Sequence, residues 1–297
     1  MSQPGPVRVC GVQTDPVLAE PGANAGLICD RMAEAASKGA HLVVFPEAAL
    51  TGYVFDTRDQ ALDGAIEVES ESVRRVRDGS RELGVWSVFG AIERVSVASG
   101  SNRHLLYNTA FLSAPSGELH RYRKVHTLCL GVDRFTTPGD EGFRVWELPF
   151  GRVGLNICYD GSFPESARAL KLLGAQLIVL PTNWPDLYLK TEQIRLRALE
   201  NHVNYIAVNR VGTERGVVFP GGSVAAGPRG ELLAEGGSEP LSFVVEMDLL
   251  SADANRVVQT PGSYEFDYVA DRRPDAYAPL RDLEPEGQPT GSRKAGD

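Results

Sequence analysis

The sequence predicts an α/β fold made of mixed β-sheets with helices on the outside. Short apolar or β-branched runs alternate with amphipathic helical stretches, which is typical of parallel strands joined by helices. Two further pairs of apolar runs are separated only by short turn sequences, which predicts antiparallel hairpins. The chain has 297 residues, 42% of them hydrophobic, so it can bury the core of one large domain or two small ones.

The alternation begins near the N-terminus. Residues 7–12 alternate and are rich in β-branched side chains, so a strand is expected there. A helix is predicted over residues 24–38, because its apolar residues share one face and Gly39 is a good stop. Residues 41–45 form a short apolar run, which predicts a second strand. The first part of the chain therefore predicts a strand–helix–strand unit.

The same pattern continues along the chain. Ala-Pro-Ser-Gly and Pro-Phe-Gly each separate two apolar runs and predict the turns of two hairpins. Ser162 and Glu165 have the spacing of a capping box, so a helix is expected to begin there and run to about Leu173. The other predicted helices are at 70–83 and 190–201, and the other predicted strands are at 85–92, 105–112, 119–123, 143–148, 152–157, 176–180, 205–209, 222–226 and 242–247.

Bulk properties narrow the class of protein. The formal net charge is -9, which argues against nucleic acid or an anionic membrane as the main partner. No apolar run has the length of a membrane span, and the first residues lack a signal-peptide pattern, so a cytoplasmic protein is expected. We expect one domain over residues 5–270 and a C-terminal extension over 271–297, with residues 285–297 disordered.

The cysteines do not predict a disulfide framework. They are widely scattered and contain no C-x-x-C pair, which also argues against a zinc site. The sequence has no H-E-x-x-H motif and no glycine-rich phosphate loop, so neither a metal nor another cofactor is expected. The four cysteines are Cys10, Cys29, Cys129 and Cys158.

Polar side chains follow several predicted strands at the point where each strand ends. Glu47, Lys124 and Cys158 each occupy such a position. In open α/β sheets, active sites lie beyond the carboxyl ends of the strands, so these side chains are candidates for one site. Each also has an ordinary structural alternative. Glu47 could cap a helix or bind an arginine, Lys124 could belong to a solvated basic patch, and Cys158 could be a packed thiol.

Together, the motifs around these residues resemble those of the nitrilase superfamily of carbon–nitrogen hydrolases. The resemblance covers about residues 7–248. It implies a four-layer α-β-β-α sandwich of two mixed β-sheets and a homodimer or larger homo-oligomer. It also implies that the glutamate, lysine and cysteine form a catalytic triad. The motifs are Phe45-Pro46-Glu47, Tyr122-Arg123-Lys124-Val125-His126 and Asn156-Ile157-Cys158-Tyr159-Asp160, in that order.

The implied triad suits hydrolysis of an amide. Cys158 would attack the carbonyl and form a thioester, and Glu47 would move the protons. Lys124 and the backbone N–H of Tyr159 would stabilise the oxyanion. Nitrile-cleaving members tend to have Trp-Glu after the cysteine, whereas this chain has Tyr-Asp, so a small amide or N-carbamoyl amine is the expected substrate. The implied pocket residues are Tyr53, Tyr159, Asn183 and Trp184, and core packing is the alternative for Tyr53 and Trp184.

One departure from the family pattern concerns a second glutamate. Many amidase-type members carry it shortly before the Pro-Gly at residues 138–139, but this chain has none there. Asp133 is the nearest carboxylate and is one methylene shorter, while Glu141 is expected at the surface. Either Asp133 positions the substrate or the pocket does without this group.

Several alternatives stay open at this point. The thioester could be resolved by an amine instead of water, and the substrate could be a nitrile. The chain could instead be a Cys–His hydrolase that uses His126 or His202. A binding protein that keeps the fold without catalysis is the non-enzymatic alternative.

Overall fold

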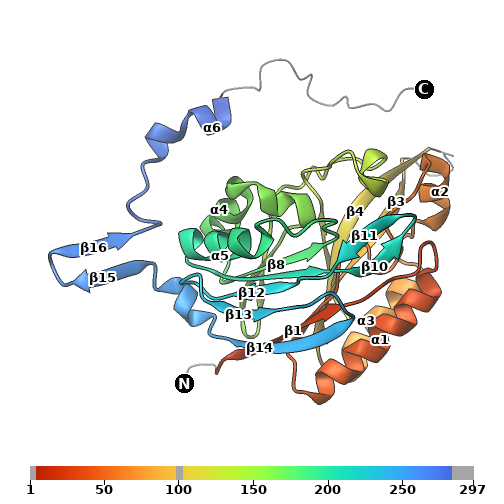
Figure 1. Ribbon diagram of the computed structural model, residues 1–297, viewed down its shortest axis with the longest axis horizontal. Coiled ribbons are helices and arrows are strands. Elements are labelled where there is room, and N and C mark those ends of the chain that lie inside the picture. The colour runs from red at the N-terminus through yellow and green to blue at the C-terminus, as the bar shows by residue number, and fades with distance from the viewer. Residues whose placement is uncertain (1–4, 98–102, 283–297) are drawn as a thin grey trace. The chain divides into compact units, whose positions relative to one another are not determined.

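The computed structural model describes residues 5–97 and 103–282. The chain forms two compact units, Met1–Asp253 and Ala254–Asp297. The first unit contains two six-stranded mixed β-sheets with helices on their outer sides (Figure 1). The α/β fold class and the four-layer arrangement are therefore confirmed.

The first sheet has the strand order β14-β1-β2-β3-β4-β5. Strands β1, β2 and β3 run parallel, and the other neighbours pair antiparallel. Helices α1 (Pro21–Ser37) and α3 (Glu71–Leu83) pack their apolar faces on this sheet. The strands are β1 (Val7–Gln13), β2 (Leu42–Val44), β3 (Trp86–Ser96), β4 (His104–Ser113), β5 (Leu119–Arg123) and β14 (Leu241–Met247).

The second sheet has the strand order β13-β12-β9-β8-β7-β6. Strands β7, β8 and β9 run parallel, while β6 and β7 form the predicted hairpin. Helices α4 (Pro164–Leu172) and α5 (Lys190–Asn201) contribute buried residues to the core on this side. The strands are β6 (Val145–Leu148), β7 (Gly151–Leu155), β8 (Leu177–Thr182), β9 (Asn204–Asn209), β12 (Val224–Ala226) and β13 (Leu232–Glu235).

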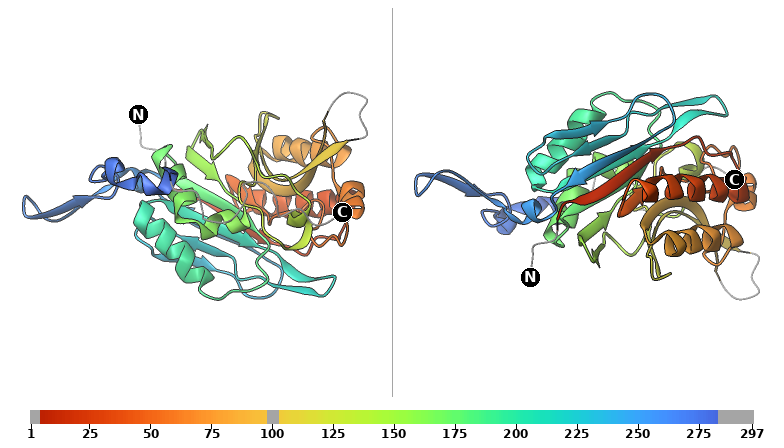
Figure 2. Two further views of the ribbon diagram at one scale, coloured as in Figure 1. Left: turned by 90° about the horizontal axis from the view of Figure 1, so that it is seen from above. Right: turned by 90° about the horizontal axis from the view of Figure 1, so that it is seen from below.

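Alternating side chains hold the layers together. Val7 and Val9 of β1 belong to the core that includes the second sheet, whereas Cys10 and Val12 of the same strand pack with α1 and α3. Successive residues of a strand face opposite sides, so β1 contributes to both apolar layers. Figure 2 shows α1 and α3 apart from α4 and α5, with the strands between the two pairs.

One local prediction is wrong, and several short elements were not predicted. The capping box at Ser162 is wrong: α4 begins at Pro164 with Phe163 as its N-cap, and Ser162 ends a preceding 3₁₀ helix, Cys158–Ser162. The fixed φ of Pro164 suits the first helical position without a side-chain cap. The sequence pattern also did not predict several short elements of the first unit, which are α2 (Arg58–Gly64), β10 (Val211–Glu214), β11 (Val217–Pro220) and β13.

The second unit is small. It contains the antiparallel pair β15 (Arg256–Thr260) and β16 (Tyr264–Asp267), followed by a 3₁₀ helix, Pro274–Tyr277, and by α6 (Pro279–Asp282). The expected domain boundary at residue 270 stays a prediction, and the expected disorder at 285–297 lies outside the described residues. Across the described ranges, none of the helices combines the length and apolar character needed to cross a lipid bilayer.

Candidate active site

The ends of three strands bring Glu47, Lys124 and Cys158 into one buried region. Glu47 follows β2, Lys124 follows β5, and Cys158 follows β7. The Nζ atom of Lys124 lies 2.7 Å from Oε1 of Glu47, and both side chains have no exposed area. Cys158 is 6% exposed. The lysine is therefore not part of a solvated patch, and its charge is matched inside the protein.

Asp133 belongs to the same cluster. It lies in the 3₁₀ helix Gly131–Arg134, and its Oδ2 atom is 2.5 Å from Nζ of Lys124. The helix can approach this closely because residue 131 is a glycine with φ of +52°, where an added Cβ would lie 2.5 Å from the Tyr53 ring. The short side chain of Asp133 therefore reaches Lys124 because the backbone of its 3₁₀ helix lies close to the cluster.

Asn108 is a member of the cluster that was not predicted from the sequence. Its Nδ2 atom donates to Oε1 of Glu47 at 2.7 Å and to Oδ1 of Asp133 at 2.8 Å. Asn108 lies within β4, whereas the predicted site residues are those that follow strand ends. A polar residue inside an otherwise apolar strand is the signal that could have identified it.

Cys158 occupies an unusual backbone position. Its φ is +44°, and it begins the 3₁₀ helix Cys158–Ser162. The carboxylate of Asp160 accepts hydrogen bonds from the backbone N–H of Ile157 at 3.0 Å and from the hydroxyl of Tyr122 at 2.7 Å. Tyr122 is on β5, two residues before Lys124. The turn that carries the thiol is thus tied to the strand that leads into Lys124.

Burial and neighbouring charges set the ionisation of the three groups. Burial raises the pKa of Cys158 to about 12, and Glu47 adds to this effect while Lys124 opposes it. Burial also raises the pKa of Glu47, against the opposing charge of Lys124. Burial alone would lower the pKa of Lys124, but Asp133 and Glu47 outweigh it, so this pKa is well above its usual value. At neutral pH the site therefore holds an ammonium and a protonated thiol that needs a base.

Comparison with known proteins places this arrangement in a family. The carbon-nitrogen hydrolase family model matches residues 7–256. The chain belongs to the carbon-nitrogen hydrolase family. This carbon-nitrogen hydrolase is 38% identical over 273 residues to a nitrilase of Pyrococcus abyssi, covering 91% of this chain and 99% of the relative. It is 36% identical over 236 residues to an (R)-stereoselective amidase of a Pseudomonas species, covering 78% and 79%.

Solved structures support the same family. A Glu→Gln mutant of the amidase from Nesterenkonia sp. AN1 matches with a TM-score of 0.76 and 28% sequence identity, covering 92% of this chain and 99% of that one. That structure shows the Michael addition of acrylamide at the active-site cysteine. The family membership and these amidase neighbours make the chain an enzyme, so the binding-protein alternative is set aside.

The four expected pocket residues of this carbon-nitrogen hydrolase differ in their surroundings. Tyr53 is buried, and its hydroxyl donates to the carbonyl of Leu130 at 3.1 Å. Burial raises the pKa of Tyr53 well above its usual value, and the charges of Asp133 and Glu47 add to this, so Tyr53 adjoins the cluster. Asn183 is buried, and its side-chain N and O atoms have no hydrogen-bond partner among the described residues.

The other two expected pocket residues contact groups outside the charged cluster. The ring of Trp184 is buried and lies 5.4 Å from Nζ of Lys190. The ring of Tyr159 is partly exposed and meets Phe163 edge-on at 5.0 Å. Glu141 is exposed, as expected, and pairs with Arg144.

The histidines considered as bases are engaged elsewhere. Nδ1 of His126 lies 2.8 Å from Oδ1 of Asp160, and its ring stacks on Phe163 at 3.8 Å. His202 follows α5, and burial lowers its pKa. The geometry therefore gives no support to the Cys–His alternative. Within residues 5–97 and 103–282, no three His, Cys, Asp or Glu side chains converge in a way that could hold a metal ion.

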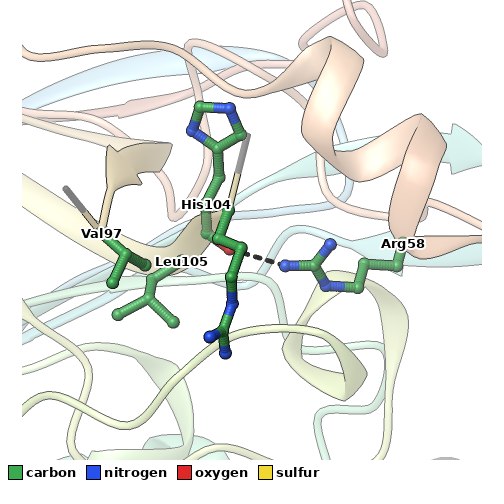
Figure 3. Close-up of a pocket in the computed structure, with 5 residues that line it drawn as sticks. Arg58, Val97, His104 and Leu105 are labelled. Carbon is green, nitrogen blue, oxygen red and sulfur yellow. Dashed lines mark hydrogen bonds between the residues drawn. The ribbon is translucent and has the colours of Figure 1, made fainter. Parts of the chain in front are cut away.

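A surface pocket lies near the start of β4, away from this cluster. Figure 3 shows Arg58 donating to the carbonyl of His104, at 2.7 Å, beside Val97 and Leu105. Arg103 completes the lining. The described residues that line the pocket carry no carboxylate and no thiol, so this lining lacks the groups that the family chemistry needs.

Gly90 on β3 determines where Glu47 can lie, which leads to a prediction. A Cβ added at Gly90 would overlap the backbone N of Ala48 and would lie 2.9 Å from Cα of Glu47. We expect Gly90→Ala to displace Glu47 and to lower kcat by about 10²-fold, the order of loss that a small misplacement causes. Turnover per folded molecule is the measurement.

Gly11→Ala on β1 is the matched control for this substitution. An added Cβ there would overlap the ring of Phe243, away from the charged cluster, so it should lower stability and leave kcat near the wild-type value. Equal kcat for the two folded variants would contradict the assigned role of Gly90.

Proposed function

We propose that this carbon-nitrogen hydrolase cleaves a C–N bond of a small amide or N-carbamoyl amine through a thioester on Cys158. The observation that carries the proposal is the buried contact of Glu47 with Lys124, at 2.7 Å, beside a protonated thiol. A thiol with a pKa of about 12 needs an adjacent base, and Glu47 is a carboxylate whose pKa is itself raised. The cluster supplies the base, the nucleophile and a fixed cation together.

The proposed first half of the reaction forms the thioester. Glu47 accepts the thiol proton as the sulfur of Cys158 bonds to the substrate carbonyl carbon. The Lys124 ammonium and the backbone N–H of Tyr159 stabilise the negative charge on the oxygen. The C–N bond then breaks, and Glu47 returns its proton to the departing nitrogen, which leaves as ammonia or an amine.

The proposed second half releases the acid product. A water molecule attacks the thioester, and Glu47 accepts one of its protons. The carbon–sulfur bond breaks, and the same proton returns to the sulfur of Cys158. The enzyme regains its starting protonation, and the net change is the addition of one water across the C–N bond.

We assign the remaining predicted residues as part of this proposal. Asp133 takes the place of the second glutamate and fixes Lys124 by its 2.5 Å contact. Tyr53 and Asn183 would contact the substrate, because Tyr53 adjoins the carboxylates and Asn183 has unsatisfied polar atoms. Tyr159 and Trp184 would line the outer part of the pocket.

The names of relatives support the proposed range of substrates. An N-carbamoylputrescine amidase of Arabidopsis thaliana is 31% identical over 272 residues, and the Pseudomonas relative is a stereoselective amidase. Both support an amide or carbamoyl substrate here. The nitrilase of Pyrococcus abyssi keeps nitrile hydrolysis as the second candidate.

A panel of small amides, N-carbamoyl amines and nitriles, with ammonia release as readout, tests the proposal. Hydrolysis of one of the first two classes, with an acyl mass increment on Cys158 in the intact protein, is the expected result. Added amines would reveal acyl transfer as a different product. Turnover of nitriles alone would overturn the substrate assignment, and turnover without an adduct on Cys158 would contradict the thioester.

We also propose that the chain forms a homodimer. The outer face of α5 exposes Leu196 and Leu199, which are 50% and 39% exposed, and apolar side chains on one helix face often mark an interface. A double Leu196→Glu, Leu199→Glu variant should elute as a monomer by light scattering. Val17→Glu, which changes an equally exposed apolar residue elsewhere, should leave the assembly unchanged.

Monomeric wild-type protein in the same light-scattering measurement would contradict the dimer.

The cytoplasmic location stays a prediction, which fractionation of the source cells would test.

A further inference from the structure

Four side chains of the cluster form a closed ring of hydrogen bonds. Nζ of Lys124 contacts Oε1 of Glu47 at 2.7 Å and Oδ2 of Asp133 at 2.5 Å. Nδ2 of Asn108 donates to the same Oε1 at 2.7 Å and to Oδ1 of Asp133 at 2.8 Å. Each carboxylate is thus held twice, once by the lysine and once by the amide, so neither can rotate without breaking two bonds.

The ring leaves one oxygen of Glu47 unused. Oε2 of Glu47 is buried and has no hydrogen-bond partner among the described residues, whereas Oε1 accepts from both Lys124 and Asn108. A buried carboxylate oxygen without a partner is costly, and such groups mark functional positions when they persist. Oε2 is the oxygen that has capacity left to accept a proton.

The orientation of the Asn108 amide follows from its neighbours. Both groups that it meets are carboxylates, which accept hydrogen bonds when ionised, so only the NH₂ end can face them. Oδ1 of Asn108 then faces away, and it has no partner among the described residues. The main chain of Asn108 also holds Lys124 in place, because the Asn108 carbonyl accepts a hydrogen bond from the backbone N–H of Lys124 at 2.8 Å.

We propose that Asn108 is a positioning residue that locks Glu47 and Asp133 against Lys124, so that Oε2 of Glu47 is the atom that exchanges protons with Cys158. The inference rests on the proposed function, in which Glu47 is the base. It adds a residue that touches neither the thiol nor the departing nitrogen and that acts through Glu47. It also assigns the proton transfers to one of the two oxygens.

The lock has a consequence for the pH dependence. The titratable groups that act on Glu47 are Lys124 from the end of β5, Asp133 from the 3₁₀ helix, and Cys158 and Tyr53 from the turns after β7 and β2. The hydrogen bond from Asn108 lowers the pKa of Glu47, so its loss should raise that pKa. Glu47 must be ionised to take the thiol proton. With a higher pKa it stays protonated up to a higher pH, so the acid limb of the reaction at Cys158 should move to higher pH.

Iodoacetamide is the probe for this test, because it alkylates a cysteine through its thiolate and does not require the natural substrate. The rate of labelling at Cys158 is measured between pH 5 and 9 by peptide mass, which separates it from the other three cysteines. In Asn108→Leu we expect the acid limb of the profile to move up by about one pH unit, the equivalent of one hydrogen bond to a charged group. On the acid limb, labelling at a given pH should fall about tenfold, and it should recover at high pH.

Thr109→Val is the matched control. Thr109 is the next residue of β4, and its buried hydroxyl donates to Oε2 of Glu93 at 2.9 Å, so this variant also removes a buried donor to a carboxylate. It should lower the melting temperature and leave the labelling profile in place. Asn108→Asp keeps the size of the side chain and adds a third carboxyl to the ring, so its acid limb should move further than that of Asn108→Leu.

Each outcome of the test decides a separate point. No labelling of wild-type Cys158 at any pH would contradict the proposed function. Wild-type labelling with an unshifted profile in both Asn108 variants would overturn only the role of Asn108. A rate that falls equally at every pH in Asn108→Leu would also overturn that role, because it would show a purely structural contribution.

Discussion

Cys158→Ala is expected to abolish turnover of every substrate of the wild-type enzyme while leaving the fold intact. Without the sulfur no thioester can form, and water has no activated route to the carbonyl carbon. Removing one small buried atom should lower the free energy of unfolding by only about 1 kcal/mol. Ammonia release, measured beside the thermal melting curve, separates loss of chemistry from loss of structure.

Cys10 offers a matched control for this variant. It is a fully buried free thiol on β1, and burial raises its pKa to about 11, but it packs in the core with α1 and α3 instead of beside Glu47 and Lys124. Cys10→Ala should keep wild-type turnover. Ammonia release by Cys158→Ala at the wild-type rate would sink the assignment of the nucleophile.

Lys124→Ala is expected to cause a large loss of kcat. Loss of one oxyanion donor costs about 10²–10³ in kcat, or about 2.7–4 kcal/mol. The substitution also leaves the carboxylates of Glu47 and Asp133 buried without their cation, and breaking a buried pair in this way destabilises by about 3–5 kcal/mol. Lys124→Met, which keeps more of the buried side-chain volume, should show the same loss of kcat.

The stability of the Lys124 variants should depend on pH with a definite sign. Burial already raises the pKa of Glu47, and loss of the opposing Lys124 charge raises it further, so the folded chain holds a proton that the unfolded chain releases. The free energy of unfolding should therefore fall as pH rises above the ordinary glutamate pKa of about 4.3. Denaturant unfolding at several pH values measures this directly.

Lys171→Met is the control that separates the loss of kcat from the loss of stability in the Lys124 variants. Lys171 is also buried, but its Nζ atom donates to the backbone carbonyls of His202 and Ala252. Its loss should lower stability without affecting kcat. Wild-type kcat in Lys124→Ala would contradict the role of the lysine in the oxyanion site.

The sequence predicted the main elements because their patterns are long and regular. Helix α5 begins and ends where expected, and the two hairpins were recognisable from their turns. The short elements α2, β10, β11 and β13 carry too little regular pattern to be recognised. The N-terminus of α4 was misassigned because a Ser-x-x-Glu spacing also occurs by chance, and Pro164 begins the helix without a side-chain cap.

The candidate site divides in the same way. Glu47, Lys124 and Cys158 could be found because each follows a strand. The contact of Asp133 with Lys124 depends on the path of a loop that approaches through Gly131, which a linear pattern does not contain. Asn108 was missed because it acts from the middle of β4, where a polar side chain has meaning only once its neighbours in space are known.

The carboxylate of Asp160 links the two sheets, since it accepts from Tyr122 in the first and from the backbone just after β7 in the second. Groups separated by 34 to 38 positions along the chain must meet before this link can form. Long-range contacts of this kind form late in folding, because the entropy of closing the loop must be overcome first. The nascent or partly folded enzyme should therefore have secondary structure before the turn that holds Cys158 is fixed in place. A reactive Cys158 would then indicate that the two sheets have packed together.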